Sequence, residues 1–195
     1  ARGVRWAVNG WLETGSSNDL VASAALSGAP DGTTFFAEHQ TKGRGRLGRS
    51  WHSPVGSGLW FSVLRRHDLP IDEAWRITLG AGLAVAKAIE KLTPIKPQLK
   101  WPNDVQIDGR KVAGILTESR PEGDRLRQSV IGIGVNVHLE RDEFPPELRE
   151  TACSVGSEGG RIGRGDLLVE ILHGLATTLE LASADLRGEW SDRCS

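Results

Sequence analysis

The chain has 195 residues, of which 38% are hydrophobic and 25% charged, a composition typical of one soluble globular domain whose core needs neither disulfides nor metal. Its 24 basic and 25 acidic residues give a formal net charge of −1, whereas a nucleic-acid-binding domain is usually strongly basic. Two cysteines, no apolar run of membrane-spanning length and no apolar signal segment predict a cytoplasmic protein with no membrane partner.

The first half of the chain predicts a helix, two strands and a longer helix. TGSSNDLVASAALSG, from Thr14, is typical of a helix with a Ser/Asn cap that ends at Gly28. Residues 32–40 and 58–66 are rich in β-branched and aromatic side chains, which predict strands. Residues 71–92 repeat apolar side chains at intervals of three and four, the clearest helical pattern of the chain.

The second half predicts a three-stranded antiparallel meander at 98–107, 111–119 and 127–137, with turns at Asp108-Gly109 and at 121–124. Residues 139–165 have no period and predict a long loop with short turns, a kind of loop that is often a functional lid. Residues 164–186 predict a final amphipathic helix. Because hairpins dominate, we expect an α+β fold with a mixed, largely antiparallel sheet packed against helices.

A basic glycine-rich segment, TKGRGRLGRSW, covers residues 41–51 and is called the basic loop below. Its glycines match a dinucleotide-binding pattern, and its end is close to a P-loop, but both motifs require a helix to follow. Here Pro54, Gly56 and Gly58 follow instead, and they predict a turn into a strand. An RNA-binding arm would be repetitive and would lie in a more basic chain.

The composition of the basic loop favours an anion-binding role. Glycines let backbone N–H groups approach an anion, and arginine makes bidentate contacts to carboxylate or phosphate. If the segment were extended, Arg44, Arg46 and Arg49 would tend toward one side. Trp51 would provide a flat apolar wall for a ligand.

A second polar cluster, KWPNDV, begins at Lys100. With Asn103 and Asp104 it brings a cation, an amide and a carboxylate close together, a set suited to a magnesium-bound nucleotide phosphate, although a simple strand bulge would use the same residues. Small residues recur on the next two strands, which predicts a groove where a ligand can lie on the sheet. The residues singled out on those strands are Lys111, Gly114, Gly132, Gly134 and Asn136.

GRGRLGRSWHSP, KWPNDV, GRKVAGILTE and IGIGVNV occur in the order and spacing of biotin protein ligases, and ETGSSND resembles that family's STN segment. The resemblance runs from about residue 10 to the final helix. It implies a class II aminoacyl-tRNA-synthetase-like fold, the biotin/lipoate ligase catalytic domain. It also implies that ATP, with Mg²⁺, activates biotin as biotinyl-5′-AMP. The acceptor would be a lysine of the biotin carboxyl carrier protein domain of acetyl-CoA carboxylase or a related carboxylase, and the ligase a monomer or homodimer.

The resemblance also implies roles for individual residues. The catalytic cations would be Lys111, Arg46 and Lys100, and Asp104 would bind magnesium. The basic loop would order over bound ligand and protect the anhydride from water. Biotin would be bound by Ser16, Ser17, Gln40, Gly43, Arg44, Trp51, Lys111, Gly114 and Gly132. The adenylate would be bound by Arg44, Arg46, Arg49, Trp51, Asn103, Lys111 and Asn136.

The resemblance also implies a domain organisation, and it leaves two alternative functions open. Residues 1–187 would form the catalytic domain, and 188–195 would begin a C-terminal β-barrel that is absent from the chain. No N-terminal DNA-binding domain is expected, as in the non-repressor members. A lipoate or octanoate ligase or transferase shares the fold but carries an RRxSGGG-type segment, which this chain lacks. An adenylate-binding domain without turnover is a further alternative, against which the intact Lys111 and KWPND argue.

Overall fold

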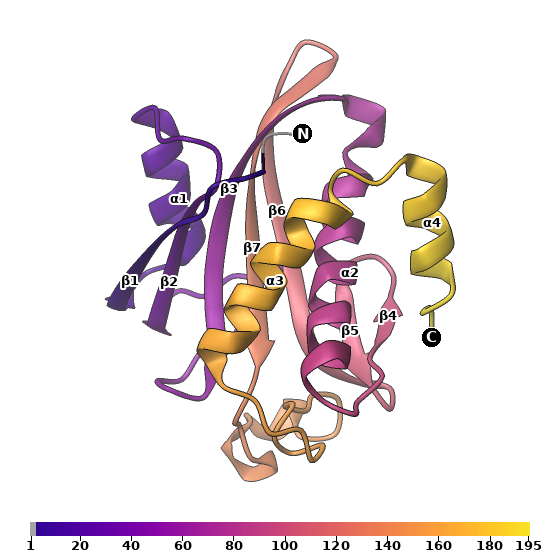
Figure 1. The fold of residues 1–195 in the computed structure, drawn as a ribbon. Helices are drawn as coiled ribbons and strands as arrows, with labels where there is room; N and C mark the ends of the chain where they lie inside the picture. Colours follow the sequence, from indigo (N-terminus) through magenta and orange to yellow (C-terminus); the bar gives the residue numbers. More distant parts are fainter. Residues whose placement is uncertain (1–2) are drawn as a thin grey trace.

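A seven-stranded mixed sheet organises the chain, and the computed structural model describes residues 3–195 (Figure 1). The strand order is β1-β2-β3-β7-β6-β5-β4, and only β1 and β2 are parallel. The strands are β1 (Ala7–Thr14), β2 (Thr33–Gln40), β3 (Gly58–Pro70), β4 (Gln98–Lys100), β5 (Asp104–Ile107), β6 (Arg110–Glu122) and β7 (Arg125–Asn136). The α+β prediction is therefore confirmed.

Four helices cover the sheet unequally. They are α1 (Ser17–Leu26), α2 (Trp75–Leu92), α3 (Arg164–Thr178) and α4 (Ser183–Ser191). The apolar stripe of α2 packs with α3 on the sheet side chains that point to one face, for example Phe61, Ile115 and Ile133, and forms the main core. On the opposite face, Val21 of α1 packs on Leu64 and Val130 and leaves the rest of that face for the basic loop.

Several local predictions are confirmed. The predicted Asp108-Gly109 turn joins β5 to β6 with φ values of +48° and +77°, the left-handed conformations that a tight hairpin needs. The β6–β7 hairpin turns at Gly123-Asp124. Residues between β7 and α3 form a loop with two short 3₁₀ turns, Arg141–Glu143 and Pro146–Leu148.

Two predicted elements are wrong in detail. The single strand at 98–107 is a hairpin of β4 and β5, because the chain reverses around Pro102, whose peptide bond with Trp101 is cis. The helix predicted at 164–186 breaks between α3 and α4, where Arg76 donates a 2.6 Å hydrogen bond to the carbonyl of Leu181. Strand β1 has no counterpart among the predictions.

The predicted domain boundary at residue 187 falls inside α4. Trp190 packs into the main core, and Leu99 of β4 donates to the Arg193 carbonyl at 2.7 Å. Residues 188–195 therefore pack against this domain as the end of α4 and a bridge to β4, and the domain boundary itself stays a prediction. A β-barrel beyond them stays a prediction.

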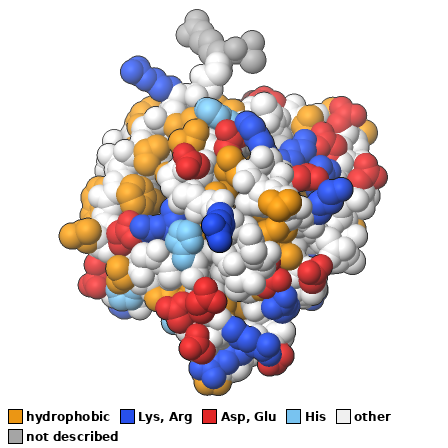
Figure 2. Space-filling model, turned by 60° about the horizontal axis from the view of Figure 1, so that its bottom comes forward, with side chains coloured by type: hydrophobic (Ala, Val, Ile, Leu, Met, Phe, Trp, Pro, Cys, Tyr) orange, Lys and Arg blue, Asp and Glu red, His pale blue; other side chains and the backbone are white. Residues whose placement is uncertain are grey.

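The surface reflects the balanced composition. Figure 2 shows basic and acidic side chains interspersed over one face of the molecule. Within residues 3–195, no helix combines the length and apolar character that crossing a bilayer requires.

Candidate functional site

A cavity of about 50 Å³ opens on the sheet face beside α1, and it has a floor of glycines. Gly132 and Gly134 lie on β7, and Gly114 on β6 pairs with Gly134. A Cβ atom on Gly132 would lie 2.2 Å from Asn18 Oδ1, and one on Gly134 would lie 2.6 Å from the Trp51 ring. The missing side chains at these positions let Asn18 and the Trp51 ring pack directly against the sheet, where both line the cavity that corresponds to the predicted groove.

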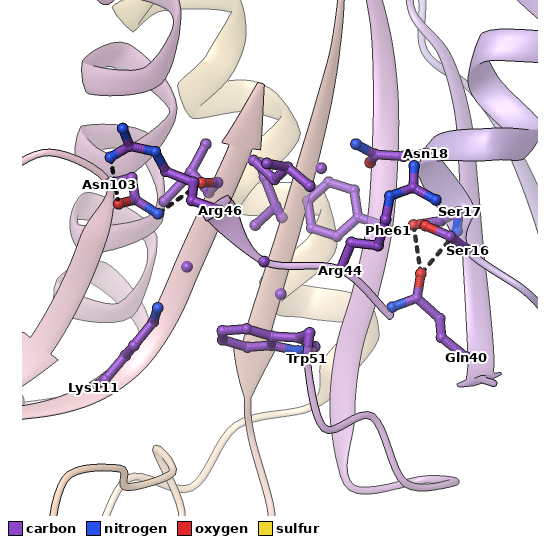
Figure 3. A pocket seen from close by; sticks show the side chains of 17 residues that line it. Ser16, Ser17, Asn18, Gln40, Arg44, Arg46, Trp51, Phe61, Asn103 and Lys111 are labelled. Carbon is purple, nitrogen blue, oxygen red and sulfur yellow. Dashed lines mark hydrogen bonds between the residues drawn. The ribbon is translucent and has the colours of Figure 1, made fainter. Parts of the chain in front are cut away.

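A buried polar cluster forms one end of the cavity (Figure 3). Gln40 Oε1 accepts hydrogen bonds from the Ser17 backbone N–H at 2.8 Å and from Ser17 Oγ at 3.0 Å. Ser17 Oγ lies 2.7 Å from Ser62 Oγ, and the Ser62 hydroxyl donates to Asn18 Oδ1. Ser16, also buried, precedes α1 and lines the same cavity. These neutral donors and acceptors suit a small polar, uncharged ligand group.

Two cations form the other end of the cavity. Lys111 Nζ on β6 lies 2.7 Å from Asp104 Oδ1 and 5.1 Å from the centre of the Trp51 ring. Arg46 Nη1 donates to the neutral Asn103 Oδ1 at 3.2 Å. The Arg46 charge therefore has no carboxylate partner among the described residues, and it is available to an anion.

A second, wider cavity of about 390 Å³ adjoins the first and shares Arg46, Trp51, Asn103 and Lys111 with it. Its far wall comes from the long loop after β7, through Phe144, Leu148, Thr151 and Ala152. The Lys111 backbone N–H donates to the Thr151 carbonyl at 2.8 Å, which fixes this wall beside the catalytic candidate. The arrangement places two ligand chambers on either side of two cations.

Most of the predicted site residues lie at these cavities. Gly43 lines neither, because its carbonyl accepts a 2.9 Å hydrogen bond from the Trp51 N–H and so closes the basic loop behind the site. The first cavity is lined by Ser16, Ser17, Gln40, Arg44, Arg46, Trp51, Asn103, Lys111, Gly114 and Gly132. Four further predicted residues line the second cavity and not the first: Arg49, Lys100, Asp104 and Asn136.

The basic loop is not extended, so the predicted common direction of its arginines is wrong. A 3₁₀ turn at Arg46–Gly48, with positive φ at Leu47 (+57°) and Gly48 (+74°), reverses the segment. Arg44 points to the α1 end of the cavity and Arg46 to Asn103 at the other end (Figure 3). No helix follows Ser50 before β3, which confirms the rejection of the dinucleotide and P-loop interpretations.

The residues that sequence reasoning missed are polar side chains inside the fold. Asn18 was adjacent to the selected serines, and Ser62 was visible as one hydroxyl within the apolar run GLWFSVL. Asp19 and Glu118, which contact Arg44, carried no signal because exposed carboxylates are common on helices and strands. Their role depends on contacts between distant segments.

Asn136 supports the site mainly through the backbone. Its Nδ2 donates to the Cys153 carbonyl at 2.9 Å and lies 3.5 Å from the Lys111 carbonyl. Burial raises the pKa of the Cys153 thiol to about 12, so this cysteine stays protonated and is a packed side chain instead of a nucleophile.

Replacing Asn136 with alanine should lower the free energy of unfolding by about 1–3 kcal/mol, because the buried Cys153 carbonyl loses its side-chain donor and the Lys111 carbonyl loses one of its two donors. Urea unfolding followed by tryptophan fluorescence measures this change. Asn9→Ala, which removes an amide from the exposed edge strand, is the matched control and should cost less than about 0.5 kcal/mol. Equal losses in the two variants would contradict the supporting role of Asn136.

The fit of the site to a metal ion is limited. Among the described residues lining the two cavities, Asp104 is the only acid, and residues 3–195 contain no group of three His, Cys, Asp or Glu side chains that could hold a metal. Magnesium in nucleotide sites is often held by one or two carboxylates together with substrate phosphates. Asp104 fits that mode as a single protein ligand. Lys111 would compete with the ion for the Asp104 carboxylate, because its Nζ contacts Asp104 Oδ1.

Comparison with known proteins agrees with this fold. Residues 13–136 match the model of the biotin/lipoate A/B protein ligase family. The chain is 44% identical over 158 residues to the bifunctional ligase/repressor BirA of Bacillus subtilis (strain 168), covering 80% of this chain and 49% of that protein. It is 42% identical over 142 residues to a biotin–[acetyl-CoA-carboxylase] ligase of Mycobacterium tuberculosis, covering 69% and 51%. The chain spans about half the length of these curated relatives.

The solved structures that resemble this fold include biotin protein ligases. A biotin protein ligase from Aquifex aeolicus in complex with biotin and ATP has 32% identity and a TM-score of 0.78, covering 96% of this chain and 78% of that one. A biotin protein ligase from Leishmania major in complex with biotinyl-5-AMP has 23% identity and a TM-score of 0.79, covering 96% and 81%, and supports the fold alone. The predicted fold class and family resemblance are confirmed.

Proposed function

The chain belongs to the biotin/lipoate A/B protein ligase family, and on this premise we propose that it joins biotin to a protein in two steps. ATP first activates biotin as biotinyl-5′-AMP, and a lysine of a biotin carboxyl carrier protein domain then accepts the biotinyl group. The relative from M. tuberculosis is named for acetyl-CoA carboxylase, so we infer that a carrier domain of such a carboxylase is the acceptor. A cytoplasmic location follows from this partner.

The observation that carries the proposal is the pair of adjoining cavities with Lys111 and Arg46 at their junction. Activation of a carboxylate by ATP brings two anions together, and their repulsion must be offset by fixed positive charge. The first cavity suits a neutral polar ring at its Ser17–Gln40 end, and the second has room for a nucleotide. Biotin's carboxylate and the α-phosphate would then meet at the two cations.

In the first step, a biotin carboxylate oxygen attacks the α-phosphorus, an anhydride bond forms and diphosphate leaves. Lys111 exchanges its contact with Asp104 for the developing charge on the reacting oxygens, and Arg46 stabilises the same charge from the basic loop. In the second step, the acceptor amine attacks the biotinyl carbonyl carbon and AMP leaves. The attacking nitrogen loses a proton, and an amide bond results.

Other residues bind and orient the reactants. Ser16, Ser17 and Gln40 hold the ureido ring, and the glycine floor with Trp51 holds the fused rings. Arg49 and Lys100 lie on the phosphate side of the second cavity, where Asp104 could hold a magnesium ion that shields phosphate charge. The Phe144 side of the loop after β7 forms the wall of the nucleotide chamber.

Incubation with ATP, labelled biotin and a carrier domain tests the proposal. We expect diphosphate release, an enzyme-bound adenylate and label on the carrier, with no label on a carrier whose acceptor lysine is arginine. Biotin should bind in isothermal titration and lipoate should not. Adenylate formation from lipoate instead would favour the lipoate branch of the family, and biotin binding without adenylate would favour a domain that does not turn over.

A further inference from the structure

Arg44 of the basic loop is held by two carboxylates. Its Nη1 and Nη2 donate to the two carboxylate oxygens of Asp19 at 2.9 and 2.8 Å, and Nη2 also lies 3.3 Å from Glu118 Oε2. Asp19 lies in the first turn of α1, and Glu118 lies on β6. The Arg44 cluster, defined as Arg44, Asp19 and Glu118, therefore ties the loop to two separate elements of the fold.

The Arg44 cluster is continuous with the polar end of the first cavity. Glu118 Oε2 accepts a 2.6 Å hydrogen bond from Asn18 Nδ2, and Asn18 Oδ1 accepts from the Ser62 hydroxyl. Ser62 in turn contacts Ser17, which donates to Gln40. Because Asn18 is buried, Glu118 is positioned by the same hydrogen bonds that shape the cavity.

Arg44 and Arg46 of the basic loop differ in the charged groups that surround them. The hydrogen bonds that Arg44 donates to Asp19 raise the pKa of Arg44, and the two carboxylates together exceed its single positive charge. Arg44 is thus poorly suited to neutralise a ligand anion, whereas the side chain of Arg46, two residues on, has only an amide oxygen as its partner within residues 3–195. The structure assigns Arg44 to loop closure and leaves Arg46 to the reactants.

We propose that Asp19 and Glu118 are positioning residues that hold the basic loop closed over the cavity through Arg44, before any ligand is bound. The consequence for the reaction, retention of the adenylate, rests on the proposed function; the closure itself does not. Asp19 and Glu118 are both well exposed, and exposed ion pairs are individually weak and screened by salt. The contact is therefore strong enough to bias the loop and weak enough to release it.

Hydrogen exchange of the ligand-free protein tests closure directly. The Gly45, Arg49 and Trp51 amides are protected by backbone bonds inside the loop. In Asp19→Asn, Glu118→Gln and the double variant they should exchange about fivefold faster or more, whereas Asp19→Glu should retain most of the protection. Raising the salt concentration should accelerate exchange in the wild-type loop and have little effect in the double variant.

Two controls separate this effect from general destabilisation. Glu170→Gln removes a carboxylate from an ion pair with Lys91 far from the loop, and it should leave loop exchange unchanged. Exchange within α1 is followed in the same samples, because Asp19 also stabilises the start of that helix. Loop exchange that is unchanged in the double variant, or that rises only together with exchange throughout α1, would overturn the proposal.

A second readout concerns the intermediate. In the double variant the half-life of bound biotinyl-5′-AMP should fall about fivefold, while single-turnover adenylate formation at saturating substrates changes less than twofold. If the wild-type protein forms no adenylate, the proposed function fails, and hydrogen exchange still tests whether Asp19 and Glu118 hold the basic loop closed. If it forms adenylate that the double variant retains as long as the wild type, the assigned role of Asp19 and Glu118 is wrong.

Discussion

Lys111→Ala should lower the rate of adenylate formation by about 10²- to 10³-fold, the loss usual for one preorganised charge at a reacting oxygen. Lys111 stands at the junction of the two cavities, and alanine leaves Arg46 as the remaining cation there. Diphosphate release in single-turnover experiments measures the effect. The expected pattern is a large fall in rate with a smaller change in biotin affinity, since the polar end of the cavity is untouched.

The fold should survive this substitution. The Lys111 backbone, through its N–H and carbonyl, makes the bonds to Thr151 and Cys153 that fix the adjoining loop, and alanine keeps both. Lys87→Ala, which breaks the ion pair of an equally half-exposed lysine with Glu189 on α4, is the matched control and should leave the rate within about twofold of wild type. An adenylation rate in Lys111→Ala close to that of Lys87→Ala would refute the role of Lys111.

The predictable parts of the fold have strong local signals. Asp108-Gly109 occupies the two turn positions that require positive φ, so the β5–β6 hairpin could be located from two residues. The α2 segment repeats its apolar side chains with helical spacing, because one stripe is buried against the sheet and α3. The glycine floor was predictable because small residues recurred on strands already expected to be neighbours.

The missed elements lack such signals. In β1 nearly every side chain is exposed, so the strand at the sheet edge shows no alternation of apolar and polar residues. The break between α3 and α4 interrupts a run that stays apolar, and it depends on Arg76, about 100 residues earlier, for its hydrogen bond to Leu181. Contacts between such distant segments cannot be deduced from local pattern.

The candidate site, like the fold, was predictable where residue types carry a local signal and not where contacts join distant segments. Residue types identified the anion-binding loop, yet they could not distinguish Arg44 from Arg46, because both follow a glycine in the same short motif. The distinction comes from partners 25 and 74 residues from Arg44 along the chain, Asp19 and Glu118, and from Asn103, which is 57 residues from Arg46. The fold, and not the local sequence, therefore determines which of the two arginines is paired with carboxylates.

Gly132→Ala should weaken biotin binding by about 10²-fold or more, measured by isothermal titration. The added Cβ would lie 2.2 Å from Asn18 Oδ1, and Asn18 cannot withdraw easily because Ser62 and Glu118 hold it inside the fold. Relief of the clash must move α1 or β7, and such overpacking costs about 1–3 kcal/mol of stability. Either shift deforms the cavity wall that contains Ser17 and Gln40.

Gly165→Ala provides the matched comparison, since the same methyl group is added in the first turn of α3, where nothing lies within 4 Å. It should leave biotin affinity unchanged and raise the free energy of unfolding by about 0.4–1 kcal/mol, because alanine restricts the unfolded chain. Opposite signs of the stability change in the two variants would show that the glycine at 132 is required by Asn18. If Gly132→Ala binds biotin as tightly as Gly165→Ala, the glycine floor is not the surface on which biotin lies.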